Sequence, residues 1–285
     1  LDAIALVSNR YSQLISVSHA ARTFNLGNLL LYYRNVRSFI DDIVVVPSFC
    51  LCVGNRDLDI RSLQDANVNF PAVCKPLASH GKTAAHKMVI LFKQSDLSLI
   101  KCHSVVQSFE NHNGILLKAY VIGDFLHLVT RPSIKNLSKE YEPIFFNSRD
   151  VSKENSHSVL NNTHDVPSIE DLGIDKSLMK RVIDSLRVRL RLKLMGVDFV
   201  IPSSAERKHH LAIIDVNVFP AKIESNHLTI SNLLLNFRTV KFAQPHFTLD
   251  YSCVPNFHFH LENLVRNMLD LPAVPLSAAA PETSV

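Results

Sequence analysis

Short apolar runs, separated by polar segments, predict most of the secondary structure. Runs rich in β-branched and aromatic residues predict strands in 43–53, 72–77, 87–92, 104–109, 115–133, 197–204 and 211–219. The second and third runs flank a loop of small residues, so we expect a hairpin with a long tip between them. The polar segment 146–173 is rich in Asn, Ser and His and predicts a loop.

Three segments predict helices. Loosely spaced apolar residues favour a helix in 10–40, and the pattern in 59–69 predicts a short one. In 175–196 apolar residues recur at every fourth position, which predicts a helix that Gly196 ends, although 187–194 taken alone alternates like a strand. Strand pairs, then a helix, then another strand pair predict an α+β or mixed α/β fold.

Composition narrows the class of protein without deciding its function. The chain has 285 residues, 47% hydrophobic and 20% charged, which is typical of one or two globular domains. A net charge of +4 would suit a polyanionic small molecule or weak contact with nucleic acid, and it distinguishes neither. Five cysteines without C-x-x-C spacing predict reduced thiols in a cytoplasmic protein. No apolar run reaches the ~20 residues of a membrane helix, and no signal peptide is visible.

Oxygen-bearing side chains interrupt two of the apolar strands. Asp215 and Asn217 lie two apart on one strand, so their side chains share a face, and Asp198 lies on the neighbouring strand. Hard oxygen ligands of this kind suit Mg²⁺, which takes its remaining ligands from water and phosphates. A polar network that closes a strand end is the alternative.

Two lysines interrupt apolar strands in the same way. Lys75 and Lys118 would be costly there without an anionic partner, so both suggest contacts with phosphate; side chains that reach solvent at a sheet edge are the alternative. The loop 79–86, SHGKTAAH, could fold over phosphates or be an ordinary hairpin tip. The basic stretch 187–193 predicts a solvated helix face, and the H-x-H in 258–264 favours core packing over metal binding.

Several stretches together resemble the inositol 1,3,4-trisphosphate 5/6-kinase (inositol tetrakisphosphate 1-kinase) family, and they occur in family order over roughly 1–220. They are NRYSQL (9–14), FPAVCKPLASHGKTAAHKM (70–88), VVQSFENHNGILLKAYVIGD (105–124), RPSIKN (131–136), IFFNSRDVSK (144–153), LMGVDFVI (194–201) and IIDVNVFP (213–220). The resemblance implies the ATP-grasp fold, with nucleotide between two sheets. We then expect a remnant of the N-terminal region plus the first subdomain in 1–107, the second subdomain in 108–271 with an insertion at 221–253, and a disordered tail in 272–285.

The resemblance also implies roles for the residues that match family motifs. ATP would be bound by Arg10, Lys75, Gln107, Ser108, Phe109, Lys118, Ser133, Ser148 and Ser152. Backbone atoms near Gln107 and Phe109 would hold the base. The inositol phosphate would be bound by His86, Lys118, Arg131 and Asn217, and Mg²⁺, as two ions, by Asp198, Asp215 and Asn217. Lys118, Asp215 and Asn217 would carry the catalysis.

The implied activity is ATP- and Mg²⁺-dependent transfer of the γ-phosphate to a hydroxyl of an inositol tris- or tetrakisphosphate. We expect a cytoplasmic monomer that binds no nucleic acid and inserts into no membrane. Phosphoryl transfer depends mostly on positioning and charge neutralisation, which agrees with the lack of an obvious strong base. Two alternatives stay open: a relative that binds nucleotide or inositol phosphate without turnover, and an ATP-grasp ligase. The stretches 79–86 and 112–120 argue against the ligase.

The sequence departs from the family in three places. Some of these departures favour the relative that binds without turnover, and others leave open how much of the family's sequence this chain contains. The family has a domain before the NR motif that builds part of the inositol phosphate site, and only about nine residues precede Arg10 here. Either the chain is a fragment or a gene model cut short, or that half of the site is lost. Ala221 stands where the family has glycine, which matters if that position needs a positive φ or close approach of a phosphate. Finally, 221–253 replaces a short loop and could be a true insertion or a translated intron.

Overall fold

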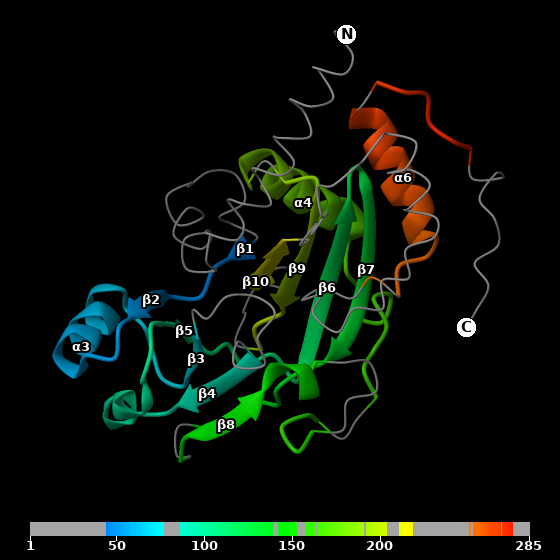
Figure 1. Ribbon diagram of the computed structural model, residues 1–285. Coiled ribbons are helices and arrows are strands. Elements are labelled where there is room, and N and C mark those ends of the chain that lie inside the picture. The colour runs from blue at the N-terminus through cyan, green and yellow to red at the C-terminus, as the bar shows by residue number, and fades with distance from the viewer. Residues whose placement is uncertain are drawn as a thin grey trace, which may run out of the picture.

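Two β-sheets with helices packed on them make up the fold (Figure 1). This computed structural model describes residues 44–76, 86–138, 142–152, 158–162, 165–190, 192–203, 211–218, 251, 253–268 and 270–275. Sheet A has the order β1 (Val44–Val45), β10 (Leu211–Val218), β9 (Leu194–Val200), β6 (Ile115–Ile122), β7 (Phe125–Pro132). Sheet B has the order β2 (Phe49–Cys52), β5 (Ser104–Ser108), β3 (Ala72–Pro76), β4 (Lys87–Leu91), β8 (Ile144–Asn147). The predicted mixed α/β fold is confirmed.

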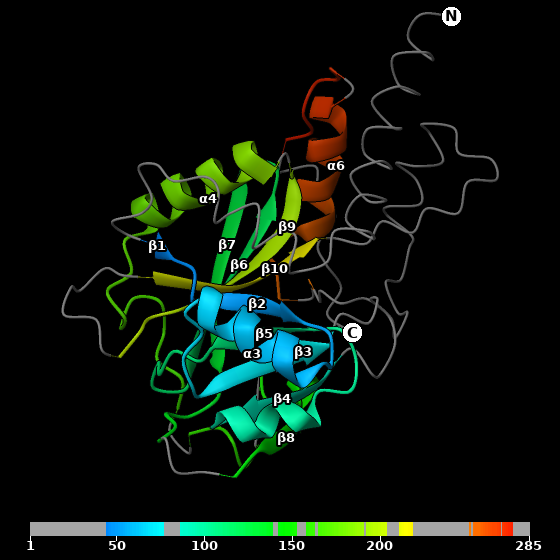
Figure 2. The ribbon, with the colours of Figure 1, turned by 90° about the vertical axis from the view of Figure 1, so that its left-hand side faces the viewer.

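Helices cover both faces of sheet A. The α-helices are α3 (Arg56–Asp65), α4 (Lys176–Leu190) and α6 (Phe257–Met268), and the 3₁₀ helices are η2 (Gln94–Leu99) and η3 (Ser148–Asp150). Figure 2 shows α4 and α6 on opposite sides of the sheet. Alternate side chains of β6 point to opposite faces, so Leu117 and Val121 pack in the cluster with α4, whereas Tyr120 and Ile122 pack in the cluster with α6.

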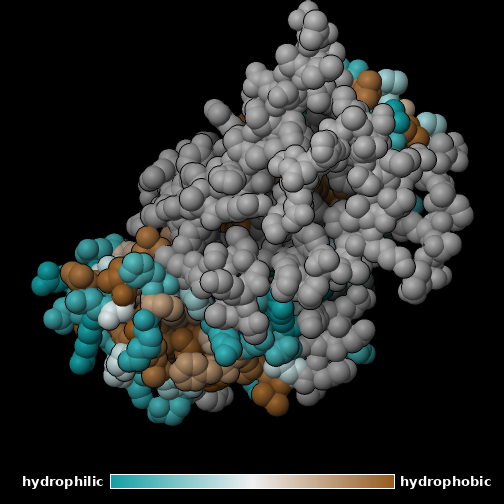
Figure 3. All heavy atoms as spheres, in the orientation of Figure 1, coloured by the Kyte–Doolittle hydropathy of each residue, from teal (hydrophilic) through white to brown (hydrophobic). Residues whose placement is uncertain are grey.

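Helix α3 covers one face of sheet B. Asn55 caps this helix by accepting a hydrogen bond from the Leu58 amide, and Leu63 packs with Cys52 and Cys74 in the core beneath it. All five cysteines are free thiols. Figure 3 shows hydrophilic and hydrophobic side chains next to one another on the surface around α3.

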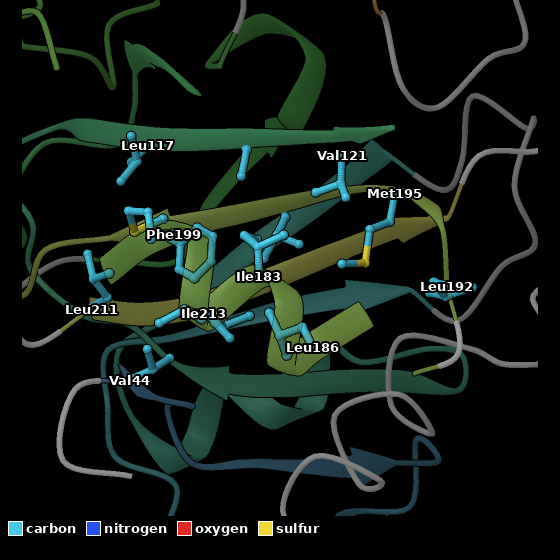
Figure 4. Packing of buried hydrophobic residues seen from close by; sticks show 14 of the residues in the cluster. Val44, Leu117, Val121, Ile183, Leu186, Leu192, Met195, Phe199, Leu211 and Ile213 are labelled. Atoms are coloured by element: carbon cyan, nitrogen blue, oxygen red, sulfur yellow. The ribbon is translucent and has the colours of Figure 1, made fainter. Parts of the chain in front are cut away.

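The largest apolar cluster lies between sheet A and α4 (Figure 4). Ile183 and Leu186 of α4 meet Phe199 of β9 and Ile213 of β10, all at most 1% exposed. This core fixes which faces of β9 and β10 remain for polar residues.

Within the described ranges, no helix is both long and apolar enough to cross a membrane.

The structure corrects four predicted elements. The helix predicted over 175–196 ends at Leu190, and Leu194 and Gly196 belong to β9, because the alternating pattern there pairs with β6. The strand predicted over 43–53 is two strands in different sheets, separated at Pro47, and the predicted loop 146–173 begins with the end of β8. The short helix begins at Arg56, three residues before the predicted start. The helix predicted in 10–40 lies outside the described residues.

The predicted division at residues 107 and 108 stays a prediction. Most strands of sheet B precede it and most strands of sheet A follow it. Two strands depart from this division. β1 precedes residue 107 but pairs with β10 in sheet A, and β8 follows residue 108 but pairs with β4 in sheet B. The two sheets are therefore interleaved along the chain.

Candidate active site

A change of register in β10 places two carboxylates opposite each other. Ile213 pairs with Phe199 in the core beneath α4, and Asp215 pairs with Asp198, so that Ile214 is an extra residue in β10. Strict alternation would have put Asp215 on the same face as Ile213. A one-residue bulge reverses the face, and Asp215 therefore lies opposite Asp198 on the side of sheet A away from α4.

Lys118 extends this pair into a row across three strands. It pairs with Asp198 in register, and its Nζ donates to Asp198 Oδ1 at 2.6 Å. The two side chains are only 13% and 14% exposed, so water screens the pair weakly. The backbone of Asn217 pairs with Gly196 on the same face, but its side chain lies outside the described residues. The row thus contains two carboxylates and one ammonium group.

Lys75 connects this row to the other sheet. It lies on β3 of sheet B, and its Nζ donates to the carbonyl of Ile214 at 2.8 Å and to Gln107 Oε1 at 2.9 Å. The bulge residue on β10 therefore supplies an acceptor to the opposite sheet. Two of the predicted ATP-binding residues, Lys75 and Gln107, meet between the sheets.

The charges of these four residues are coupled. Burial lowers the pKa of Lys75, and the charges of Asp215 and Asp198 oppose that shift. Burial likewise raises the pKa of Asp215; Asp198 adds to that increase, while Lys75 and Lys118 oppose it. Two carboxylates that repel each other at a partly buried site would be stabilised by an additional cation.

The donor set fits a Mg²⁺ ion that takes part of its coordination from a ligand. Among the residues that the structure describes, no group of three or more His, Cys, Asp or Glu could hold a metal ion. Asp198 and Asp215 supply oxygen from neighbouring strands, and Mg²⁺ characteristically needs only one or two carboxylates when water and phosphates complete its octahedron. The predicted third ligand, Asn217, is on the same strand as Asp215.

Other predicted residues lie in separate groups. His86 Nδ1 and Ser148 Oγ are 3.2 Å apart where β4 begins and β8 ends. The hydroxyl of Ser108 accepts from the Asn69 amide, and the Phe109 amide donates to the Pro71 carbonyl, so both groups are engaged within sheet B and its connections. Ser152 is half-buried after η3, and Arg10 lies outside the described residues. The roles given to these residues stay predictions.

Comparison with known proteins assigns the chain to a family. The family model described as the inositol 1,3,4-trisphosphate 5/6-kinase ATP-grasp domain matches residues 39–237. The chain belongs to this family. The match confirms the resemblance seen in the sequence, and it identifies the two-sheet arrangement as the ATP-grasp fold.

Relatives within the inositol 1,3,4-trisphosphate 5/6-kinase family are moderately similar in sequence. Inositol-tetrakisphosphate 1-kinase of Xenopus laevis is 34% identical over 192 residues, covering 66% of this chain and 47% of the relative. The Danio rerio protein of the same name is 32% identical and covers 67% and 48%, and inositol-tetrakisphosphate 1-kinase 2 of Glycine max is 28% identical and covers 82% and 70%. The chain spans about half the length of the first two.

A solved D-alanine–D-alanine ligase of Bacillus anthracis aligns with 75% of this chain and 62% of its own, with a TM-score of 0.40 and 13% identity.

The range matched by the family model bears on two further features of the chain, helix α6 and the predicted insertion. Helix α6 follows the range matched by the family model. That range ends at residue 237, inside the predicted insertion 221–253, so the insertion stays a prediction.

Sequence reasoning missed a buried polar network in this ATP-grasp domain. His112 is 4% exposed, with Nδ1 2.5 Å from the Glu110 carbonyl and Nε2 2.8 Å from the Ser133 hydroxyl. Because a carbonyl only accepts, Nδ1 carries the proton and Nε2 accepts from Ser133. Asn161 in turn donates to the Ser133 carbonyl. Ser133, predicted to line the nucleotide, is thus part of a buried network; sequence alone gave no signal for its partners.

This network predicts a pH dependence of stability. Burial lowers the pKa of His112, so between that pKa and the ordinary value of 6.5 the unfolded chain binds the proton and the folded chain does not. The free energy of unfolding should therefore fall as pH drops below about 6.5, by up to ~1.4 kcal/mol per pH unit. In urea unfolding measured between pH 7 and 5, the free energy of unfolding of His112→Gln should fall less steeply with decreasing pH than that of the parent. His103→Gln, at an exposed site, is the control; an unchanged slope in His112→Gln would contradict the argument.

Proposed function

We propose that the chain is an ATP- and Mg²⁺-dependent inositol phosphate kinase. It transfers the γ-phosphate of ATP to a hydroxyl of an inositol tris- or tetrakisphosphate. The row of Asp215, Asp198 and Lys118, which Lys75 approaches from the opposite sheet, carries the proposal. Such a cluster has the oxygen ligands for Mg²⁺ and the cations for phosphates that phosphoryl transfer requires. The names of the family and of its relatives support the choice of substrate.

Each residue of the row has a defined task in this proposal. Asp198, Asp215 and Asn217 would hold Mg²⁺, which when bound neutralises phosphate charge. Lys75 would exchange the Ile214 carbonyl for a phosphate oxygen of ATP, and Lys118 would exchange Asp198 for a transferring or substrate phosphate. Because Lys118 is only 13% exposed and Lys75 is held by a carbonyl of the opposite sheet, both cations would stabilise the developing charge more than they could in solvent. That the protein works as a cytoplasmic monomer stays a prediction.

Turnover measurements distinguish the proposal from its alternatives. The purified chain is incubated with Mg²⁺, ATP and a panel of inositol tris- and tetrakisphosphates, and ADP release is recorded. A kinase releases ADP only with an inositol phosphate present. A relative without turnover would show a higher melting temperature with inositol phosphate or nucleotide but no ADP. A ligase would release ADP only when an amine and a carboxylate are supplied together.

Lys75 should control the affinity for ATP. Replacing a buried ammonium group that binds phosphate with an apolar side chain, as in Lys75→Met, should raise the KM for ATP about tenfold or more. The KM for inositol phosphate should change far less, because Lys75 lies beside Gln107 on the predicted nucleotide side. Lys93→Met is the control, since Lys93 is exposed and pairs with Glu142. An unchanged KM for ATP in Lys75→Met would contradict this assignment.

A further inference from the structure

The guanidinium group of Arg131 is held by residues from two distant parts of the chain. Its Nη2 donates to the Tyr120 hydroxyl at 3.0 Å and to Cys253 Sγ at 3.4 Å. Arg131 lies on β7 and Tyr120 on β6, whereas Cys253 precedes α6. Cys253 thus lies outside the range matched by the family model, yet it contacts an arginine predicted to bind substrate.

Tyr120 lies between the two cations that we assign to the inositol phosphate. Its ring centroid is 5.7 Å from Lys118 Nζ, and its hydroxyl accepts from Arg131. Burial, together with the side-chain hydrogen bond to Cys253, raises the pKa of Tyr120, so the hydroxyl stays neutral at physiological pH. A neutral hydroxyl can orient Arg131 without cancelling its charge, and the face of the ring attracts the ammonium group. Tyr120 therefore adds no negative charge beside either cation.

The segment around Cys253 is anchored on the same face of sheet A as the carboxylate row. The ring of Tyr251 lies 5.2 Å from that of Tyr120 and 4.8 Å from that of Phe257. Leu264 of α6 packs in this cluster and approaches Gly123, whose positive φ of 59° forms the turn between β6 and β7. Figure 2 shows α6 along this side of the sheet. The packing fixes where Cys253 meets Arg131.

We propose that Tyr120 and Cys253 are positioning residues that hold Arg131 for the inositol phosphate, so that the segment before α6 completes the substrate site. This inference rests on the proposed function. An arginine side chain loses much rotamer freedom when it binds a phosphate, and contacts that restrict it beforehand reduce that loss. If Arg131 served only to attach α6, removing the Tyr120 hydroxyl would lower stability and leave substrate affinity unchanged.

Steady-state kinetics of variants that keep the packing test the inference. Tyr120→Phe removes only the hydroxyl, and Cys253→Ala removes only the thiol. Each should raise the KM for inositol 1,3,4-trisphosphate about fivefold to tenfold. The kcat and the KM for ATP should stay within about twofold. The matched controls are Tyr251→Phe, in the ring that packs on Tyr120, and Cys102→Ala, at an exposed site; both should leave all three constants within about twofold.

A double-mutant cycle shows whether the effect acts through Arg131. In the Arg131→Met background, Tyr120→Phe should change the KM for the trisphosphate by less than about twofold. If the effects of Tyr120→Phe and Arg131→Met on this KM were fully additive, or if Tyr120→Phe left the KM unchanged while the parent is active, the positioning role would be overturned. The proposed function would still stand. A parent chain that neither turns over the trisphosphate nor binds it in calorimetry would overturn the proposed function, and this inference with it.

Discussion

Asp215→Asn is expected to reduce phosphoryl transfer about a thousandfold while the fold persists. The substitution keeps the shape of the side chain and removes the charge that would hold Mg²⁺ opposite Asp198. Stability should not fall. Burial raises the pKa of Asp215, so the ionised carboxylate destabilises the folded chain at neutral pH. The neutral amide removes that penalty.

Kinetics and unfolding at two pH values test this expectation together. The variant should be at least as stable as the parent at pH 7. This difference in the free energy of unfolding should shrink as pH falls toward the ordinary pKa of Asp, because the carboxylate of the folded parent takes up its proton first and no longer bears the penalty of a buried charge. Asp124→Asn is the matched control, since Asp124 is 89% exposed and pairs with Arg187 away from the row. Turnover like the parent's in Asp215→Asn would refute the metal assignment.

Lys118→Met is expected to lose both activity and stability, with the loss of stability depending on Mg²⁺. Without the ammonium group, Asp198 is a partly buried carboxylate beside Asp215, which should cost about 3 kcal/mol of unfolding free energy. Loss of a cation that stabilises the transferring phosphate should reduce kcat about a hundredfold or more. Added Mg²⁺ would neutralise the two carboxylates and restore part of the stability.

Thermal unfolding in EDTA and in Mg²⁺ separates these effects. Lys118→Met should melt well below the parent in EDTA and closer to it in Mg²⁺. Lys180→Met removes an exposed lysine that pairs with Asp184 along α4, and its stability should change by no more than about 0.5 kcal/mol in either buffer. A Lys118→Met variant that is as stable and as active as the parent would show that the ion pair with Asp198 has neither role.

The pattern of short apolar runs predicted the strands well, because most strand residues are buried and β6 packs apolar side chains on both of its faces. It placed β3, β4 and β5 within one residue, and it put Asp198 and Asp215 on neighbouring strands. The boundary between α4 and β9 was harder, because residues at period four also alternate from 187 onward. Pairing of Gly196 with Tyr120 on β6 decides that stretch in favour of a strand, which no local pattern shows.

Features of the site that depend on distant contacts were not predictable. The extra residue Ile214 changes which face Asp215 occupies and gives Lys75 its carbonyl acceptor, yet a one-residue bulge leaves no mark on an apolar strand. Cys253 was predicted only to be a reduced thiol. Its contact with Arg131 joins residues 122 apart and follows from packing of α6.

Transfer of label from the γ-phosphate of ATP to inositol 1,3,4-trisphosphate, by the purified chain with Mg²⁺, tests the central claim most directly. The account predicts a labelled inositol tetrakisphosphate from the parent and none above background from Asp215→Asn. A parent chain that binds ATP but forms no labelled product from any inositol tris- or tetrakisphosphate would contradict it.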